Sequence, residues 1–281
     1  MFHTAQRLRQ MLNSPGMVVA PFVFDAFQAR IAQAAGFEAV YMTGFGTAAA
    51  RGFPDVGLLT MAEMVENVRY IANAVNIPLV CDADTGYGNP VNVYRTVREY
   101  EVAGAAALHI EDQVWPKRCG FLAGKQVIPM EEMVPKVQAA CDARRDTNFV
   151  IIARTDALAV NGWEDVITRA RAYRAAGADL IFVDGIRTLD DMKQYAQELG
   201  DLPLLYNGQL LPVQEIQKFG CFKLTIYTAT LMAFYLRMRD AMRELKATGS
   251  IARGAEFGVF EEMTSLLGVP EAMALGKKYG S

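Results

Sequence analysis

The sequence has little that would mark a secreted, membrane-bound or nucleic-acid-binding protein. Its 281 residues include only four cysteines, which lie far apart and form no CxxC pair. This spacing argues against a disulfide framework or a zinc cluster. No apolar run is as long as a membrane span, and the N-terminus has no signal-peptide core. We therefore expect a cytoplasmic protein with no membrane partner.

Charge of one sign is also scarce in any one stretch. Lysine and arginine total 28 against 31 aspartates and glutamates, and without a long basic run no nucleic-acid partner is expected. A GxGxxG motif is missing after the first apolar segment, which removes the main support for an open dinucleotide-binding sheet. Apolar residues make up 52% of the chain, enough for a packed core, and no linker divides it. Residues 1–281 are predicted to form a single domain.

The chain does contain a regular alternation of short apolar segments and helix-like stretches. Strands are predicted to begin near Met17, Ala39, Pro78, Ala107, Phe149, Leu180, Leu204 and Leu224. Helical patterns separate them over Asp25–Ala35, Met61–Ala74, Pro90–Ala103, Pro129–Ala143, Trp163–Ala175, Leu189–Leu199 and Pro212–Phe219. This order predicts an α/β fold, a (β/α)8 TIM barrel, with an open doubly wound sheet as the alternative. The helical pattern continues from Thr230 to Ser281, which predicts additional C-terminal helices and an oligomer.

Carboxylates end two neighbouring apolar segments. Asp82 and Asp84 close one segment, and Glu111 closes the next. Side chains two residues apart on a strand share a face, and the carboxyl ends of barrel strands meet on one rim. Converging carboxylates repel one another unless a cation neutralises them, and such oxygen ligands suit Mg²⁺ or Mn²⁺. The sequence therefore predicts a metal site, with helix capping or surface ion pairing as the alternative. His109, in the same segment as Glu111, is expected to be buried and hydrogen-bonded rather than a ligand.

The motif Lys117-Arg118-Cys119-Gly120 follows the Glu111 segment. Because positive neighbours favour a thiolate, the pKa of Cys119 is expected to be lowered. Such a group can act in acid–base chemistry and protonate a carbanion, on a loop that closes over substrate. An incidental, exposed cysteine is the alternative. The other cysteines are expected to be packing residues.

These motifs together carry a resemblance to a known group of enzymes. The chain resembles the isocitrate lyase/phosphoenolpyruvate mutase superfamily over nearly its whole length, in the segments 43–46, 54–60, 82–89, 110–113, 117–120 and 152–156. It is most similar to the short branch that contains methylisocitrate lyase, 2,3-dimethylmalate lyase, oxaloacetate hydrolase and carboxyphosphonoenolpyruvate mutase. The resemblance implies a TIM barrel that assembles as a homotetramer, a dimer of helix-swapped dimers.

The resemblance also implies roles for individual residues. Mg²⁺ would be held by Asp82 and Asp84, partly through waters anchored by Asp55 and Glu111. A small-molecule carboxylate substrate would be bound by Thr43, Gly44, Phe45, Gly120, Arg154, Asp184 and Asn207. Cys119 would be the acid that protonates the departing carbanion, and Arg154 would stabilise enolate-like charge. The residues do not single out the base; Tyr41 and Asp55 are candidates.

Several positions depart from the family pattern. Phe121 stands where histidine is usual, and Asp184 where glutamate is usual. The segment after Asn207 is short and uncharged, and Thr228 replaces a proline. Each lost cation would leave a substrate carboxylate unpaired in a closed site, which disfavours a tricarboxylate substrate.

We therefore expect a Mg²⁺-dependent carbon–carbon lyase. Its substrate would be a 2-hydroxy dicarboxylate, dimethylmalate-like or methylisocitrate-like, cleaved to a 2-oxo acid and a second carboxylate. The alternatives are an oxaloacetate-type carbon–carbon hydrolase, a phosphonate-forming (carboxyphosphonoenolpyruvate) mutase, and a barrel that binds a dicarboxylate without turnover.

Overall fold

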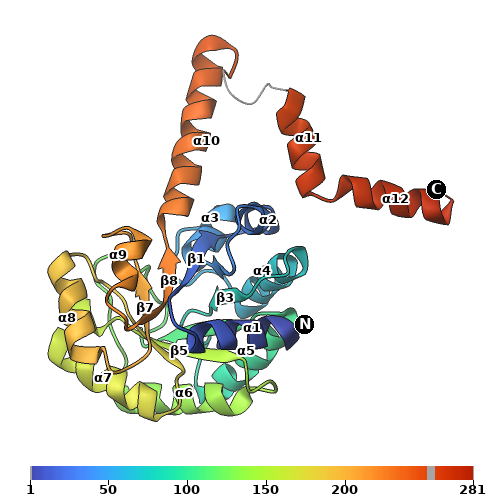
Figure 1. The fold of residues 1–281 in the computed structure, drawn as a ribbon. Helices are drawn as coiled ribbons and strands as arrows, with labels where there is room; N and C mark the ends of the chain where they lie inside the picture. Colours follow the sequence, from blue (N-terminus) through green and yellow to red (C-terminus); the bar gives the residue numbers. More distant parts are fainter. Residues whose placement is uncertain (1, 252–256, 281) are drawn as a thin grey trace.

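The chain forms a closed barrel of parallel strands wrapped by helices (Figure 1). The computed structural model describes residues 2–251 and 257–280. The strands follow one another around the barrel in chain order: β1 (Val18–Val23), β2 (Val40–Met42), β3 (Leu79–Asp82), β4 (Ala107–Glu111), β5 (Val150–Thr155), β6 (Leu180–Val183), β7 (Leu204–Asn207) and β8 (Phe222–Tyr227). β1 also pairs in parallel with β8, which closes the barrel. Each predicted strand is matched by an observed one, so the predicted (β/α)8 fold is confirmed.

Helices fill the connections and extend the C-terminus. They are α1 (Phe2–Asn13), α2 (Ala26–Ala34), α3 (Gly44–Ala50), α4 (Met61–Ala74), α5 (Pro90–Ala103), α6 (Met130–Ala143), the 3-10 helix η1 (Ala157–Ala159), α7 (Trp163–Ala175), α8 (Leu189–Leu199), α9 (Val213–Gln217), α10 (Ala229–Thr248), α11 (Phe257–Leu266) and α12 (Val269–Tyr279). All predicted helical stretches are present, but α1 and α3 were not predicted. The first turn of α3 contains two glycines of low helix propensity, and Thr43 starts the helix by accepting a hydrogen bond from the Gly46 N–H at 3.3 Å.

Apolar side chains pack in two layers, one on each side of the strands. Inside the barrel, Val80, Ile152 and Leu205 belong to one buried cluster, and Leu8 and Leu12 of α1 join it. The opposite faces of the strands pack against the surrounding helices in a second cluster. Alternation of side chains across each strand produces the two layers. The resulting rigid wall supports a site at the carboxyl ends of the strands.

The connection from β3 to α5 shows how the sequence sets the helix that follows the Asp82 motif. Asn89 caps α5, and its side-chain oxygen accepts hydrogen bonds from the N–H groups of Val91 and Asn92. Pro90 occupies the first helical turn, where a missing N–H costs nothing. The helix ends at Gly104, whose φ of 105° lies in the left-handed region that glycine adopts without strain. The sequence predicted both ends of this helix.

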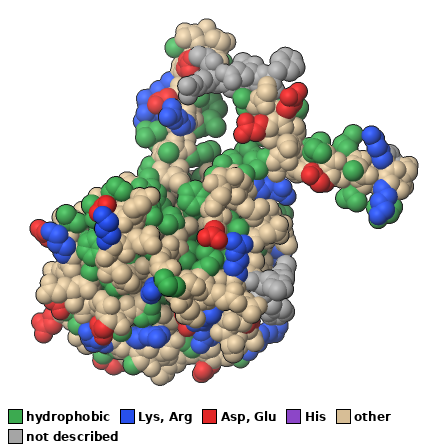
Figure 2. All heavy atoms as spheres, in the orientation of Figure 1, with side chains coloured by type: hydrophobic (Ala, Val, Ile, Leu, Met, Phe, Trp, Pro, Cys, Tyr) green, Lys and Arg blue, Asp and Glu red, His purple; other side chains and the backbone are tan. Residues whose placement is uncertain are grey.

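The C-terminal helices form an arm that leaves the barrel. α10 continues from β8 away from the barrel, and α11 and α12 extend from it (Figure 1). α11 meets α2, where Arg30 Nη1 donates to the carbonyl oxygen of Leu266 at 3.0 Å. Apolar side chains such as Met242, Phe260 and Met273 are exposed along the arm, and apolar groups gather there in Figure 2. The predicted additional helices are confirmed. Within residues 2–251 and 257–280, no helix combines the length and hydropathy that a membrane span requires.

Candidate active site

Polar side chains from successive strands converge at the carboxyl end of the barrel. Asp82 and Glu111 are the last residues of β3 and β4, Arg154 is the penultimate residue of β5, and Asp184 directly follows β6. Their exposed fractions are only 5%, 1%, 7% and 5%, respectively. The structure therefore gathers on one rim the side chains that the sequence assigned to strand ends.

Asp82 is held by three donors from different segments. Its Oδ2 accepts from the Gly44 N–H at 3.1 Å and from the Tyr41 hydroxyl at 3.4 Å, and its Oδ1 accepts from the Asp84 N–H at 2.9 Å. A side chain at position 44 would not fit, because a Cβ there would lie 2.6 Å from Asp82 Oδ2. Burial alone would raise the pKa of Asp82, but the positive charges of His109, which is protonated at low pH, of Lys117 and of Arg154 lower that pKa to about 2. Asp82 is therefore fixed in place as a carboxylate.

Lys117 reaches the same carboxylates from the loop after β4. Its ammonium group pairs with Asp55 and lies 2.9 Å from Asp84 Oδ1. Burial raises the pKa of Asp84 to about 6 and raises the pKa of Glu111 well above its usual value. Glu111 Oε1 is buried without a hydrogen-bond partner. The cluster therefore leaves a buried Glu111 oxygen without a protein partner.

The oxygen atoms gathered here are of the kind that a hard divalent cation binds. Across the described ranges 2–251 and 257–280, no group of three His, Cys, Asp or Glu side chains converges closely enough to hold a metal by itself. Oxygen ligands from water or substrate would therefore have to complete the coordination of any ion bound here. Glu111 Oε1 has no hydrogen-bond partner, and Asp84 Oδ1 lies near the Lys117 ammonium group without an aligned hydrogen bond. Such an ion, or a water that it orders, would give both carboxylate oxygens a partner. Of the predicted set, Asp55 and Asp84 are linked through Lys117, Asp84 bonds to Asp82 through its N–H, and Glu111 pairs with Arg154.

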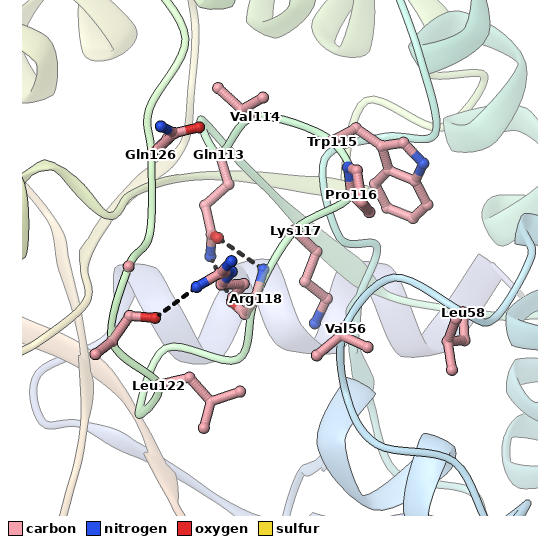
Figure 3. Close-up of a pocket in the computed structure, with 12 residues that line it drawn as sticks. Val56, Leu58, Gln113, Val114, Trp115, Pro116, Lys117, Arg118, Leu122 and Gln126 are labelled. Carbon is pink, nitrogen blue, oxygen red and sulfur yellow. Dashed lines mark hydrogen bonds between the residues drawn. The ribbon is translucent and has the colours of Figure 1, made fainter.

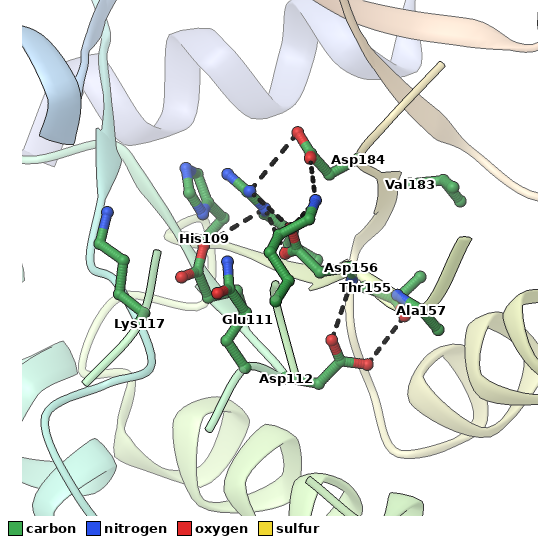
Figure 4. Close-up of polar contacts among 12 residues, drawn as sticks. His109, Glu111, Asp112, Lys117, Thr155, Asp156, Ala157, Val183 and Asp184 are labelled. Atoms are coloured by element: carbon green, nitrogen blue, oxygen red, sulfur yellow. Dashed lines mark hydrogen bonds and ion pairs between the residues drawn. The ribbon is translucent and has the colours of Figure 1, made fainter. Parts of the chain in front are cut away.

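Arg154 sits at the centre of a second ion-pair network, and Figure 4 labels its partners Glu111, Asp156 and Asp184. Its Nε lies 2.8 Å from Asp156 Oδ2 and 3.2 Å from Glu111 Oε2, and its Nη2 lies 3.4 Å from Asp184 Oδ1. The guanidinium carbon also lies 5.0 Å from the ring centroid of Phe182. These contacts orient the planar donor group and keep it charged. Arg154 can therefore stabilise negative charge at the barrel mouth.

Cys119 lies inside the site, but its chemistry differs from the sequence prediction. The residue is 8% exposed, and its N–H donates to the carbonyl oxygen of Asp55 at 3.0 Å. Burial and the nearby Asp55 carboxylate raise the pKa of Cys119 to about 11. The prediction of a favoured thiolate is therefore wrong, because Lys117 is paired with carboxylates and Arg118 Nη1 bonds to the carbonyl oxygen of Ala123 at 3.0 Å. The thiol is a protonated group, which is the form an acid requires.

The predicted catalytic Tyr41 and its neighbour His109 form a buried pair beneath Asp82. Tyr41 Oη lies 2.8 Å from His109 Nε2, and both side chains are buried. Burial raises the pKa of Tyr41 well above its usual value and lowers the pKa of His109 to about 4. Both groups are therefore neutral near pH 7, and the expectation of a buried, hydrogen-bonded histidine is confirmed.

The remaining predicted substrate contacts differ in what they face. Gly120 faces the network, since a Cβ on it would lie 2.4 Å from Asp184 Oδ2, and Asn207 at the end of β7 accepts a hydrogen bond from the Thr228 hydroxyl at 2.9 Å. Thr43 and Gly44 begin α3, but the Gly44 N–H is already used by Asp82. The Phe45 side chain is 40% exposed and lines an apolar groove against α10. Its side chain therefore does not face the carboxylates.

Sequence reasoning missed the role of two buried residues in this network. Lys125 Nζ lies 2.7 Å from Asp156 Oδ1 and 2.8 Å from Asp184 Oδ2. Asp156 belongs to the 152–156 motif, but the sequence predicts no role for it. Its N–H donates to Asp112 Oδ1 at 2.9 Å. A lone lysine in a polar loop gives no signal in the sequence, whereas an aspartate two residues after Arg154 could have been read as its partner.

The loop that carries Cys119 also has an outer face, which borders a cavity of about 890 Å³ (Figure 3). Trp115, Leu58 and Leu122 line it together with Lys117, whose ammonium group pairs with Asp55 and Asp84. Gln113 braces the loop from within: its Nε2 donates to the carbonyl oxygen of Arg118 at 2.8 Å, and its Oε1 accepts from the Arg118 N–H at 2.9 Å. Lys117 therefore connects this cavity with the buried carboxylate cluster.

Comparison with known proteins agrees with this geometry. A family model described as phosphoenolpyruvate phosphomutase matches residues 8–246. The chain is 40% identical to the 2,3-dimethylmalate lyase of Eubacterium barkeri, over 99% of each sequence. It is also 40% identical to the 2-methylisocitrate lyase of Aeropyrum pernix, in an alignment that covers 86% of this chain and 80% of that one.

Solved structures give the same picture. A 2,3-dimethylmalate lyase, described as a member of the PEP mutase/isocitrate lyase superfamily, superposes with a TM-score of 0.91 at 39% identity, over 99% of this chain and 96% of that one. An oxaloacetate acetylhydrolase bound to 3,3-difluorooxalacetate gives a TM-score of 0.92 at 36% identity, over 100% and 98%. A phosphonopyruvate hydrolase in complex with oxalate and Mg²⁺ gives 0.89 at 30% identity, over 99% and 100%. The names agree with the resemblance found in the motifs.

Proposed function

This chain belongs to the phosphoenolpyruvate phosphomutase family, and on that premise we propose that it is a Mg²⁺-dependent carbon–carbon lyase. Its substrate is a 2-hydroxy dicarboxylate of the dimethylmalate or methylisocitrate type, which it cleaves to a 2-oxo acid and a second carboxylate. The observation that carries this proposal is the protonated Cys119 thiol, buried beside a carboxylate cluster with unsatisfied oxygens. An acid for a departing carbanion and acceptors for a cation are the two requirements of such a cleavage.

Asp82, Asp84, Asp55 and Glu111 are the residues that would hold Mg²⁺, or Mn²⁺ in its place. When bound, the ion would polarise the 2-hydroxyl and the adjacent carboxylate and so favour the developing 2-oxo acid. The neutral segment after Asn207 offers no cation for a third carboxylate, which supports a dicarboxylate substrate.

The chain's own residues supply the remaining chemistry. The bond between C2 and C3 of the substrate breaks as the 2-hydroxyl loses its proton, and the bonding pair passes to C3, where Cys119 delivers the thiol proton. Arg154 stabilises the enolate-like charge. Tyr41 stays protonated, and its hydroxyl already contacts Asp82 Oδ2 at 3.4 Å and His109 Nε2 at 2.8 Å, so it could accept the substrate hydroxyl proton only by giving its own proton to one of them. Asp55 remains the other candidate base.

A second function, hydrolysis of an oxaloacetate-like 2-oxo dicarboxylate, has one specific observation in its favour. Thr228 provides a hydroxyl where the lyases that this chain resembles carry proline, and this hydroxyl lies 2.9 Å from Asn207 Oδ1. Because this hydroxyl already donates to Asn207, we favour the lyase.

Product analysis tests the proposal. Purified protein with Mg²⁺ is given 2,3-dimethylmalate, methylisocitrate, oxaloacetate and phosphonopyruvate in separate reactions. Pyruvate from dimethylmalate, at a higher kcat/KM than from methylisocitrate, supports the dicarboxylate lyase. Oxalate from oxaloacetate as the dominant product would favour the hydrolase. If none of the four compounds is turned over, the chain is a barrel that binds a dicarboxylate without turnover.

We further propose that residues 1–281 form a single barrel domain with a helical extension, in a cytoplasmic homotetramer of helix-swapped dimers. The exposed apolar side chains of α10 to α12 support this assembly, because an unpartnered arm of this kind favours contact with another copy.

A further inference from the structure

The loop of residues 117–125 begins and ends with a buried lysine. Phe121 and Leu122, at its tip, are 63% and 46% exposed, whereas Lys117 and Lys125 are 3% and 8% exposed. Burying a lysine is costly unless its charge is paired. Each lysine therefore marks a point at which the loop is fastened to the barrel.

Lys125 is fastened by two carboxylates on different strands. Its Nζ lies 2.7 Å from Asp156 Oδ1, just beyond β5, and 2.8 Å from Asp184 Oδ2, just beyond β6. Asp156 is itself fixed by Arg154, whose Nη2 lies 3.0 Å from Oδ1, and by its own N–H bond to Asp112. The Lys125 ammonium group thus ends between two carboxylates that follow neighbouring strands, Asp156 and Asp184, both labelled in Figure 4.

Asp184 contacts the same loop a second time, next to Cys119. A Cβ at Gly120 would lie 2.4 Å from Asp184 Oδ2 and 2.8 Å from Arg154 Nη2, so the loop backbone rests directly on these groups. The Asp184 oxygen that binds Lys125 is therefore also the surface against which Gly120 packs. Holding the Asp184 carboxylate in place therefore sets the distance between the loop backbone and the site.

We propose that Lys125 is a positioning residue that holds the loop closed and so keeps the Cys119 thiol at the reacting carbon. Lys117 cannot do this alone, because its partners Asp55 and Asp84 belong to the set we assign to the metal. The partners of Lys125 lie outside that set, so this attachment does not depend on metal binding. For the role of Cys119 the inference rests on the proposed function; the attachment of the loop does not.

The test is the rate at which iodoacetamide alkylates Cys119 in the full-length protein, resolved by peptide mass spectrometry. Lys125→Met should speed alkylation of Cys119 by about tenfold or more, because it breaks a buried ion pair that closes the loop. Cys141 on α6, half-buried and remote from the loop, is the internal reference and should not change. Lys125→Arg should restore the slow rate. Lys193→Met, which removes a lysine with an exposed partner 3.3 Å away, is the matched control.

In an activity assay the same variant should lose kcat by on the order of 10²-fold with a smaller change in KM, since a displaced acid affects chemistry more than binding. If Lys125→Met does not fold, Lys125→Gln, which keeps a donor in the pocket, takes its place in both measurements. Unchanged alkylation of Cys119 in the folded variant would overturn the inference. Faster alkylation in a protein without lyase activity would instead retain the loop attachment and reject the proposed function.

Discussion

At the scale of single residues, contacts in space rather than neighbours in sequence decide the chemistry of Cys119. Lys117 and Arg118 adjoin it along the chain, yet one pairs with Asp84 and the other with the Ala123 carbonyl. The thiol instead lies buried near Asp55, which raises its pKa to about 11. The sequence predicts Cys119 as the acid but could not give its protonation state, because burial depends on how the loop folds back.

This difference predicts a pH profile. An acid must be protonated to act, so activity is lost only as pH rises through its pKa, and for Cys119 that value is about 11. The kcat of the lyase should therefore show no descending limb from about pH 7 to about pH 9.5. The profile is measured with saturating Mg²⁺ and substrate. A decline centred near pH 8 would mean that the thiolate is favoured, as the sequence alone suggested.

At the scale of elements, the sequence predicted the strand-end residues of the site and the loop that carries Cys119, but not the contacts that the loop makes with other strands. Asp82, Glu111 and Arg154 end apolar segments, and a parallel barrel brings all such ends to one rim. The positions of Lys125 and Gly120 depend on how the loop after β4 folds over other strands, which no local pattern encodes. The short helix α3 was missed for a related reason, because a cap from Thr43 outweighs the low propensity of its glycines.

The close fit of the loop gives a prediction at this scale. Gly120→Ala would add a Cβ 2.4 Å from Asp184 Oδ2, so the loop must shift away from the site. We expect kcat to fall by on the order of 10²-fold while the thermal midpoint changes little, because a misplaced catalytic group costs rate more than stability. Ala123→Ser adds one atom at an exposed position of the same loop and should leave kcat unchanged. Equal kcat in the two variants would show that the loop tolerates the extra carbon.

At the scale of the whole molecule, the barrel forms the site, and the exposed C-terminal arm is the part of the chain that supports the assembly we propose. The arm's apolar side chains are exposed, and α10 forms one wall of an apolar groove that Phe45 and Met242 line. The sequence predicted this extension from its helical pattern, whereas the direction in which it leaves the barrel depends on packing against β1 and α2.

Assembly can be tested through this groove. Met242→Glu would bury a charge wherever another copy covers α10, so the mass in light scattering should fall below that of a tetramer. Leu189→Glu makes the same change at an exposed position on α8 and should leave the mass unchanged. A tetramer that survives Met242→Glu would show that α10 does not take part in the interface as proposed.

The central claim is that a thiol acid and a cation-binding carboxylate cluster act together on one substrate. The most direct measurement is pyruvate release from 2,3-dimethylmalate by the native protein and by Cys119→Ser, each with Mg²⁺ and again with EDTA. We predict steady release by the native protein with Mg²⁺, none with EDTA, and a loss of about 10²- to 10⁴-fold in the folded serine variant. Release that persists in EDTA, or that Cys119→Ser leaves intact, would contradict the account.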